Sequence, residues 1–87
     1  MSAVEYRVTR GGVGAGNPAD RNGSYVRVLT PEDAAYRYHV RNPDVRIVDV
    51  QLWKDATGTL CTDAEQRLVL TFELVDELFY HTNTYRA

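Results

Sequence analysis

The residues most suggestive of chemistry are the glycines near the N-terminus. Gly12, Gly14 and Gly16 follow a predicted strand, and successive backbone N–H groups in such a loop can face a phosphate. A dinucleotide site needs a helix directly after the last glycine, but Asn17-Pro18 follows here, and the Gly-Lys-Ser/Thr ending of a P-loop is missing. We therefore predict no nucleotide and no other cofactor, and interpret the glycine-rich stretch as a long mobile loop over residues 10–23.

Nucleophilic, acid–base and metal-ligating residues are few and scattered. Cys61 has no basic neighbour in the sequence that would lower the pKa of its thiol. One cysteine with His39 and His81 cannot assemble a structural zinc site of the usual Cys/His kind. Asp76 and Glu77 are adjacent, so their side chains point in different directions in a helix or a strand and suit shared acid–base work poorly. We predict no catalytic residue, no metal site and no enzymatic activity.

Tyrosine and arginine are the more informative residue types. The chain has six tyrosines, and all of its ten basic residues except Lys54 are arginines. Protein interfaces favour both types, because each combines a large apolar body with a polar end. A GC-rich genome also gives arginine in place of lysine, so composition alone does not decide the matter. The aromatic and basic residues that we assign to a candidate partner-binding surface are Arg7, Tyr25, Arg27, Tyr36, Arg37, Arg41 and Trp53.

Charge is distributed unevenly along the chain. The formal net charge is −2, which lacks the basic field of a general nucleic-acid binder and the strong acidity of a DNA mimic. Acidic residues outnumber basic ones after residue 53. The acidic residues that we expect to engage basic grooves, if the protein inhibits a nucleic-acid-handling complex, are Asp55, Asp63, Glu65, Glu73, Asp76 and Glu77.

Alternation of apolar and polar side chains predicts the strands that position these residues. It covers residues 4–8 and 24–29, which can form a hairpin around the glycine-rich loop, and then residues 46–53. In the hairpin, Arg7, Tyr25 and Arg27 share one face. We predict an extended connection from Lys54 to Gln66.

One helix has clear start and stop signals. Thr30 can cap the free N–H groups, Pro31 suits the first helical position, and the two acidic residues that follow complement the helix dipole. The helix should end at Asn42, because the residue before a proline leaves helical geometry. The predicted helix covers residues 31–41.

The C-terminal third is ambiguous. Residues 67–75 fit a strand by alternation, but they also carry a helical stripe, and Thr62 with Glu65 could form a capping box. We predict a strand, because the segment is rich in β-forming residues. Residues 76–85 fit either a short helical turn or another edge strand.

Size and patterning together indicate one domain, residues 1–87, of the α+β class. A chain of 87 residues supports a single core. We expect a mostly antiparallel sheet of four or five strands with the helix packed on one face, in the order β-β-α-β-β. The sequence has no apolar run long enough to span a bilayer and no apolar core of a secretion signal near the N-terminus. We therefore expect a cytoplasmic protein without membrane contacts.

These observations lead to two main hypotheses about function, beside a third, a small enzyme or ligand-binding domain with a pocket between helix and sheet that is lined by Tyr36 or Tyr38 together with His39. The first is a non-enzymatic protein-binding domain that occupies a partner's surface, either as an adaptor or as a small phage-type inhibitor of the anti-CRISPR kind; a second copy of the chain is another partner to consider. The alternative is a nucleic-acid-binding module that uses an Arg/Tyr sheet face to stack single-stranded bases.

Overall fold

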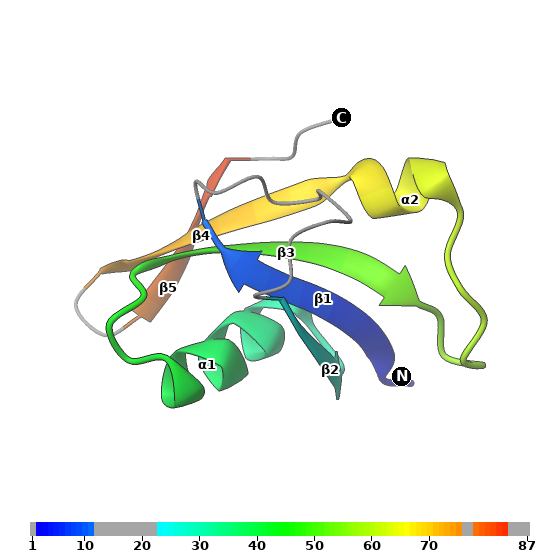
Figure 1. The fold of residues 1–87 in the computed structure, drawn as a ribbon, viewed down its shortest axis with the longest axis horizontal. Helices are drawn as coiled ribbons and strands as arrows, with labels where there is room; N and C mark the ends of the chain where they lie inside the picture. Colours follow the sequence, from blue (N-terminus) through cyan, green and yellow to red (C-terminus); the bar gives the residue numbers. More distant parts are fainter. Residues whose placement is uncertain (1, 12–22, 76–77, 84–87) are drawn as a thin grey trace.

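Five strands and two helices make up the part of the chain that the computed structural model describes, residues 2–11, 23–75 and 78–83 (Figure 1). In chain order the elements are β1 (Val4–Arg10), β2 (Ser24–Val28), α1 (Pro31–Arg41), β3 (Ile47–Lys54), α2 (Asp63–Arg67), β4 (Val69–Val75) and β5 (Leu78–Asn83).

The strands form one antiparallel sheet with the spatial order β2-β1-β3-β4-β5. The predicted hairpin is confirmed, since β1 pairs with β2 in a register that sets Arg7 opposite Tyr25. β3 pairs with the other side of β1, so β2 and β3 run in the same direction on either side of it. Helix α1 makes the crossover between them and lies on one face of the sheet (Figure 1). This arrangement leaves β2 at one edge.

The start and stop of α1 are as predicted. The side-chain oxygen of Thr30 accepts a hydrogen bond from the backbone N–H of Asp33 at 3.2 Å, and Pro31 is the first helical residue. At the other end, the N–H of Asn42 donates to the carbonyl of Tyr38 at 3.0 Å. The helix is therefore fixed at both ends by local hydrogen bonds.

The hydrophobic core lies between α1 and the sheet. Ala34 and Ala35 are fully buried and allow the helix to approach the strands closely. The strands present an apolar row to it, which includes Val8, Val50 and Phe72. Each large apolar side chain buried in this way contributes about 1.5–3 kcal/mol of favourable transfer free energy. This layer holds α1, and with it the crossover, against the sheet.

The predicted α+β class with an antiparallel sheet and a helix on one face is confirmed, but the order β-β-α-β-β is wrong. The connection predicted to be extended contains α2, because Thr62 and Glu65 do form a capping box. The helix lasts little more than one turn, since Leu68 adopts extended geometry and β4 follows at once. Residues 78–83 form a strand, β5. Most of the predicted glycine-rich loop, residues 12–22, lies outside the described residues.

Candidate functional site

The sheet face opposite α1 is polar and buried. Arg7, Thr9 and Asp49 are each 2% exposed or less. The guanidinium of Arg7 donates to the side-chain oxygen of Gln51 at 2.9 Å, and the amide of Gln51 donates to the backbone carbonyl of Gln66, at the end of α2, at 2.6 Å. These directed contacts tie α2 to the centre of the sheet and fix the orientation of Arg7.

A group of aromatic and arginine side chains lies beside this polar layer, toward the β2 edge. The rings of Tyr25 and Trp53 meet edge to face, with centroids 5.3 Å apart. The guanidinium carbon of Arg7 lies 5.9 Å from the centre of the Trp53 ring, within the range of a cation–π interaction. Trp53 is thus held between a buried cation and an exposed tyrosine. Arg7, Tyr25 and Trp53 lie on one face of the sheet, as predicted.

The aromatic and arginine side chains on this face differ in how far they are exposed to solvent. Tyr25 is 53% exposed and Arg27 is exposed, whereas Arg7 is 2% exposed. Arg27 also donates to the backbone carbonyl of Ala3 at 3.1 Å. Arg7 therefore supports Trp53 from within the protein, because a guanidinium so deeply buried cannot contact a partner directly.

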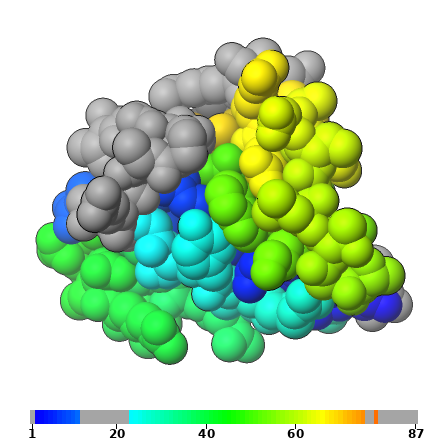
Figure 2. Space-filling view, turned by 45° about the vertical axis from the view of Figure 1, so that its right-hand side comes forward, coloured from blue at the N-terminus to red at the C-terminus, as the bar shows by residue number. Residues whose placement is uncertain are grey.

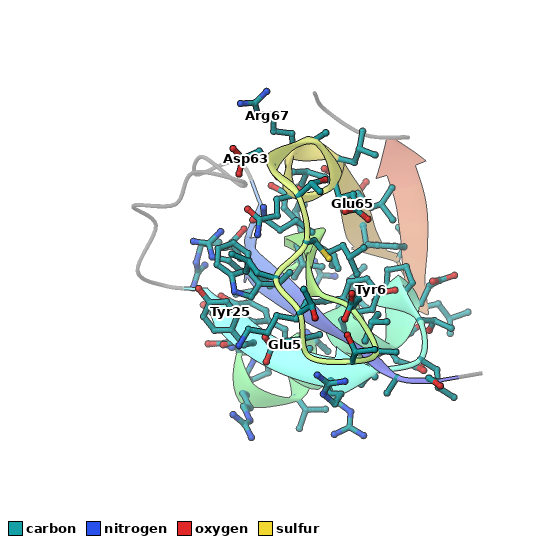
Figure 3. All side chains as sticks on the ribbon, turned by 90° about the vertical axis from the view of Figure 1, so that its right-hand side faces the viewer. Glu5, Tyr6, Tyr25, Asp63, Glu65 and Arg67 are labelled. Carbon is teal, nitrogen blue, oxygen red and sulfur yellow. The ribbon has the colours of Figure 1, made fainter. Side chains whose placement is uncertain are left out.

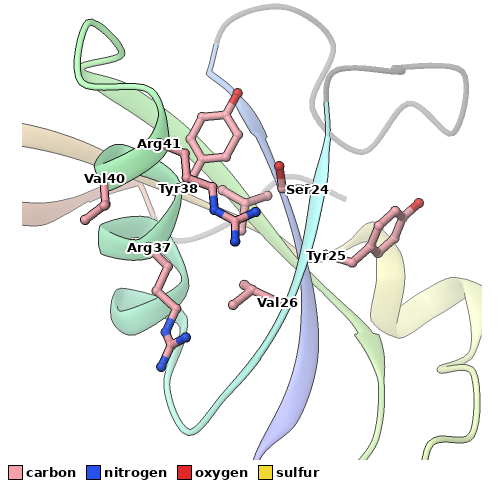
Figure 4. Close-up of a pocket in the computed structure, with 8 residues that line it drawn as sticks. Ser24, Tyr25, Val26, Arg37, Tyr38, Val40 and Arg41 are labelled. Carbon is pink, nitrogen blue, oxygen red and sulfur yellow. The ribbon is translucent and has the colours of Figure 1, made fainter.

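A groove of about 280 Å³ lies on the other side of β2, between that strand and α1 (Figure 4). Its lining residues include the predicted Arg37 and Arg41, and Figure 4 shows them on the flank of the helix that faces β2. Val26 and Tyr38 lie deeper between the two elements, while the side chain of Tyr25 points away from the helix. Tyr36 does not line this groove; it lies with Arg37 at a separate hollow near Ala3.

The space-filling view shows how β2 meets the surface. Figure 2 shows residues of β2 (cyan) between α1 (green) and the connection that leads through α2 (yellow-green). The strand has a partner on one side only, β1. Within the described residues, the outer backbone edge of β2 is left without a strand partner.

Sequence reasoning missed Val40, which lines the groove next to the two arginines and is 79% exposed. An apolar residue at this helical position, between Arg37 and Arg41 and off the stripe that contains Ala34 and Tyr38, was the available signal. Ser24 and Val26 also line the groove. Their role depends on α1 lying alongside β2, which local patterns do not reveal.

Two of the predicted acidic side chains that the structure describes are engaged in local hydrogen bonds. Asp55 accepts hydrogen bonds from the hydroxyl of Thr57 and from the N–H groups of Thr57 and Thr59, and these bonds, that hydroxyl first, lower the pKa of its carboxyl. Glu65 is engaged in the capping box with Thr62.

Two other predicted acidic residues are free of such local bonds. Asp63 and Glu73 are exposed, the first on α2 (Figure 3) and the second on β4. Asp76 and Glu77 lie outside the described residues. The acidic half of the predicted site is therefore divided between turn-forming carboxylates and separate exposed ones.

An apolar hollow of about 350 Å³ lies on the α1 side of the sheet, beyond the start of the helix. Tyr6 and Leu68 are among its lining residues. Figure 3 shows Tyr6 and Tyr25 on opposite sides of the molecule, as their alternation along paired strands requires. Burial, and secondly the negative charge of Glu32, raise the pKa of the Tyr6 hydroxyl.

The residues considered for catalysis or metal binding have ordinary surroundings. Burial, followed by the charges of Glu65 and Asp55, raises the pKa of the Cys61 thiol, which disfavours the reactive thiolate. The ring nitrogen Nδ1 of His39 lies 3.2 Å from the carbonyl oxygen of Val45. The side chain of His81 lies outside what is described. Among the described residues, no three His, Cys, Asp or Glu side chains come together as a metal site.

Comparison with known proteins finds no matching family model, no significantly similar curated protein and no significantly similar solved structure. Neither described helix is long and apolar enough to cross a membrane.

Proposed function

We propose that the protein is a non-enzymatic binding domain that acts by occupying the surface of a protein partner. The part that binds is the β2 surface, which we define as the outer edge of β2 together with the side chains of β2, α1 and β3 that flank this strand on the two faces of the sheet. Its residues are Tyr25, Arg27, Arg37, Val40, Arg41 and Trp53. One observation carries the proposal: β2 is an edge strand without a partner in the described structure, with interface-type side chains on both faces.

The residue types support a protein partner. Tyrosine, tryptophan and arginine dominate the binding free energy of protein interfaces, because they bury a large area for a small loss of rotamer entropy. Trp53 is already fixed by Arg7 and Tyr25, so little further ordering is needed when a partner covers it. An exposed valine beside two arginines, as at Val40, adds apolar area that would otherwise face water.

The biological role that follows is that of an adaptor or of an inhibitor of the phage type, of which anti-CRISPR proteins are an example. Both roles need only a surface that covers part of a partner. In the inhibitor role, the exposed carboxylate of Asp63 would add a contact to a basic groove. A partner interaction that is indifferent to charge reversal at Asp63 would remove that contribution and leave the β2 surface as the binding site.

A second candidate function is binding of single-stranded nucleic acid. The Tyr25–Trp53 pair with Arg27 nearby favours it, because bases stack on aromatic rings and arginines contact phosphates. The net charge of −2 disfavours it. It predicts that labelled single-stranded RNA binds at low salt, that the affinity falls steeply as salt rises, and that Arg27→Ala weakens it. No binding at low salt would eliminate this alternative.

Site-specific photo-cross-linking tests the protein-binding function. A benzophenone amino acid in place of Tyr25 should give a discrete cross-linked band with a protein in an extract of the native cell. The matched control places the same group at Val75, which is 42% exposed but lies on β4, three strands away from β2. Cross-linking at position 25 that is abolished by Arg37→Glu, with none at position 75, is expected. Equal cross-linking at both positions, or none, contradicts the proposal.

A further inference from the structure

The groove between β2 and α1 carries net positive charge. Among the described residues that line it, none is acidic and two are arginines. Neither Arg37 nor Arg41 forms an ion pair with another described residue. By contrast, Arg10, the last residue of β1, does pair with a carboxylate, that of Asp44 at 3.6 Å. Both groove arginines are exposed and so remain available for an external carboxylate.

The backbone beside this groove offers a second kind of recognition. In an antiparallel pair, alternate residues of an edge strand direct their N–H and C=O groups away from the sheet. β2 has five residues, and only β1 pairs with it. An extended chain that runs along the outer edge would take up these groups, and every second side chain would then point toward α1.

The spacing of the two arginines along α1 agrees with the spacing of alternate side chains in an extended chain. Arg37 and Arg41 are one helical turn apart, a rise of about 6 Å along the helix axis. Residues i and i+2 of an extended chain lie on the same side, about 7 Å apart. Two acidic side chains at alternate positions of an added strand therefore match the spacing of the two arginines.

We propose that the partner presents an extended acidic segment, with carboxylates at alternate positions, that adds to β2 as a sixth strand and places these carboxylates on Arg37 and Arg41. This inference rests on the proposed protein-binding function. The intervening side chains of the segment point to the opposite face, where Tyr25 of β2 is exposed. Apolar or aromatic residues suit those positions, because the Tyr25 ring there is half exposed.

A second copy of this chain fits the edge less well than an acidic segment. Two β2 strands paired across a two-fold axis would bring both sets of Arg37 and Arg41 to the same side of the joined sheet. Like charges close together cost free energy, and β2 supplies no carboxylate to offset them. The groove therefore selects a partner of opposite charge.

A synthetic peptide provides the test. The probe is a fluorescein-labelled seven-residue peptide in which glutamate alternates with valine, and binding to the intact protein is followed by fluorescence polarisation. The control peptide has lysine in place of each glutamate. We expect saturable binding of the glutamate peptide and at least ten-fold weaker binding of the lysine peptide. The double substitution Arg37→Glu with Arg41→Glu should reverse this preference, and because both positions are exposed the variant should remain folded.

Backbone methylation of the peptide separates strand addition from simple charge attraction. N-methyl groups on one alternate set of residues remove the N–H groups that face β2, and on the other set they remove N–H groups that face solvent. Whichever way the peptide runs, one set should abolish binding and the other should leave it within about three-fold. Equal effects of the two sets, or equal binding of the glutamate and lysine peptides, would overturn the inference.

The proposed function and this inference fail in different ways. If the benzophenone at position 25 captures a protein but the glutamate peptide does not bind, the β2 surface binds a partner of other chemistry and only the acidic-strand inference is lost. If neither occurs, both are lost.

Discussion

β1 and β2 are neighbours in one sheet and have similar alternating sequences, but they have opposite surroundings. β1 has a strand on each side, and its residues Arg7, Val8 and Thr9 are each 2% exposed or less. β2 has a strand on one side, and Tyr25 is 53% exposed. A strand inside the sheet must satisfy its polar groups within the chain, whereas an edge strand keeps hydrogen-bonding capacity for another molecule. The same residue type therefore has different roles on the two strands.

Substitution of Arg7 on β1 and of Arg27 on β2 tests this comparison, and it should give the largest difference in the free energy of unfolding. Arg7→Ala removes a buried hydrogen bond to Gln51 and the cation beside Trp53, so we expect the free energy of unfolding to fall by about 2–3 kcal/mol. Arg27→Ala, on the exposed strand, should change it by no more than about 0.5 kcal/mol. Urea denaturation of both variants measures the difference. Equal losses would mean that β1 and β2 are equivalent in the stability of the sheet.

The N-terminal cap of α1 tests whether peptide binding in the groove depends on the start of this helix. Thr30→Ala removes the hydrogen bond to the N–H of Asp33 and should lower the free energy of unfolding by about 1 kcal/mol. Peptide binding to Arg37 and Arg41 should be retained, because these residues lie in the later turns of the helix. Thermal denaturation and fluorescence polarisation give the two readings. A loss of binding as large as that of the arginine double variant would show that the helix start forms part of the site.

The smallest expected effect is a change in the pKa of the hydroxyl of Tyr6, a residue of β1. Burial and the charge of Glu32 raise the pKa of its hydroxyl, so Glu32→Gln should lower that pKa partway toward the ordinary value while burial still holds it up. Because the folded state has the higher pKa, the stability that this tyrosine contributes is present below about pH 10 and is lost as the pH rises through the folded value. Ultraviolet difference titration of the wild type and the variant measures the shift. An unchanged or raised pKa in the variant would contradict the assignment of Glu32 as a cause.

Local signals were enough to predict much of the fold. The cap at Thr30 and the stop at Asn42 depend on residues within a few positions of each other, and alternation placed β1 and β2 in register with Arg7, Tyr25 and Arg27 on one face. An extended connection was predicted where α2 lies, because the capping box of this helix competed with the strong alternation just after it; both patterns are present, in adjacent segments.

The candidate site was predictable only in part. The burial of Arg7 depends on contacts with Gln51, which is 44 residues away in the sequence, and no pattern near Arg7 indicates it. The groove depends on α1 lying beside the β2 edge, so Val40 and Ser24 acquire a role only once the crossover is formed. Residue type identified Tyr25, Arg37 and Arg41, and tertiary structure placed them on the two faces of one strand.

Amide hydrogen exchange by NMR tests the central claim, that the β2 edge accepts an added strand, most directly. In the free protein the outward N–H groups of residues 24–28 should exchange rapidly, while those of β1 and β3 are protected on both sides. Addition of the glutamate–valine peptide should slow exchange at alternate residues of β2 by at least ten-fold and leave β4 unchanged. Unchanged exchange in β2 at saturating peptide, or protection confined to α2 and β4, would contradict the account.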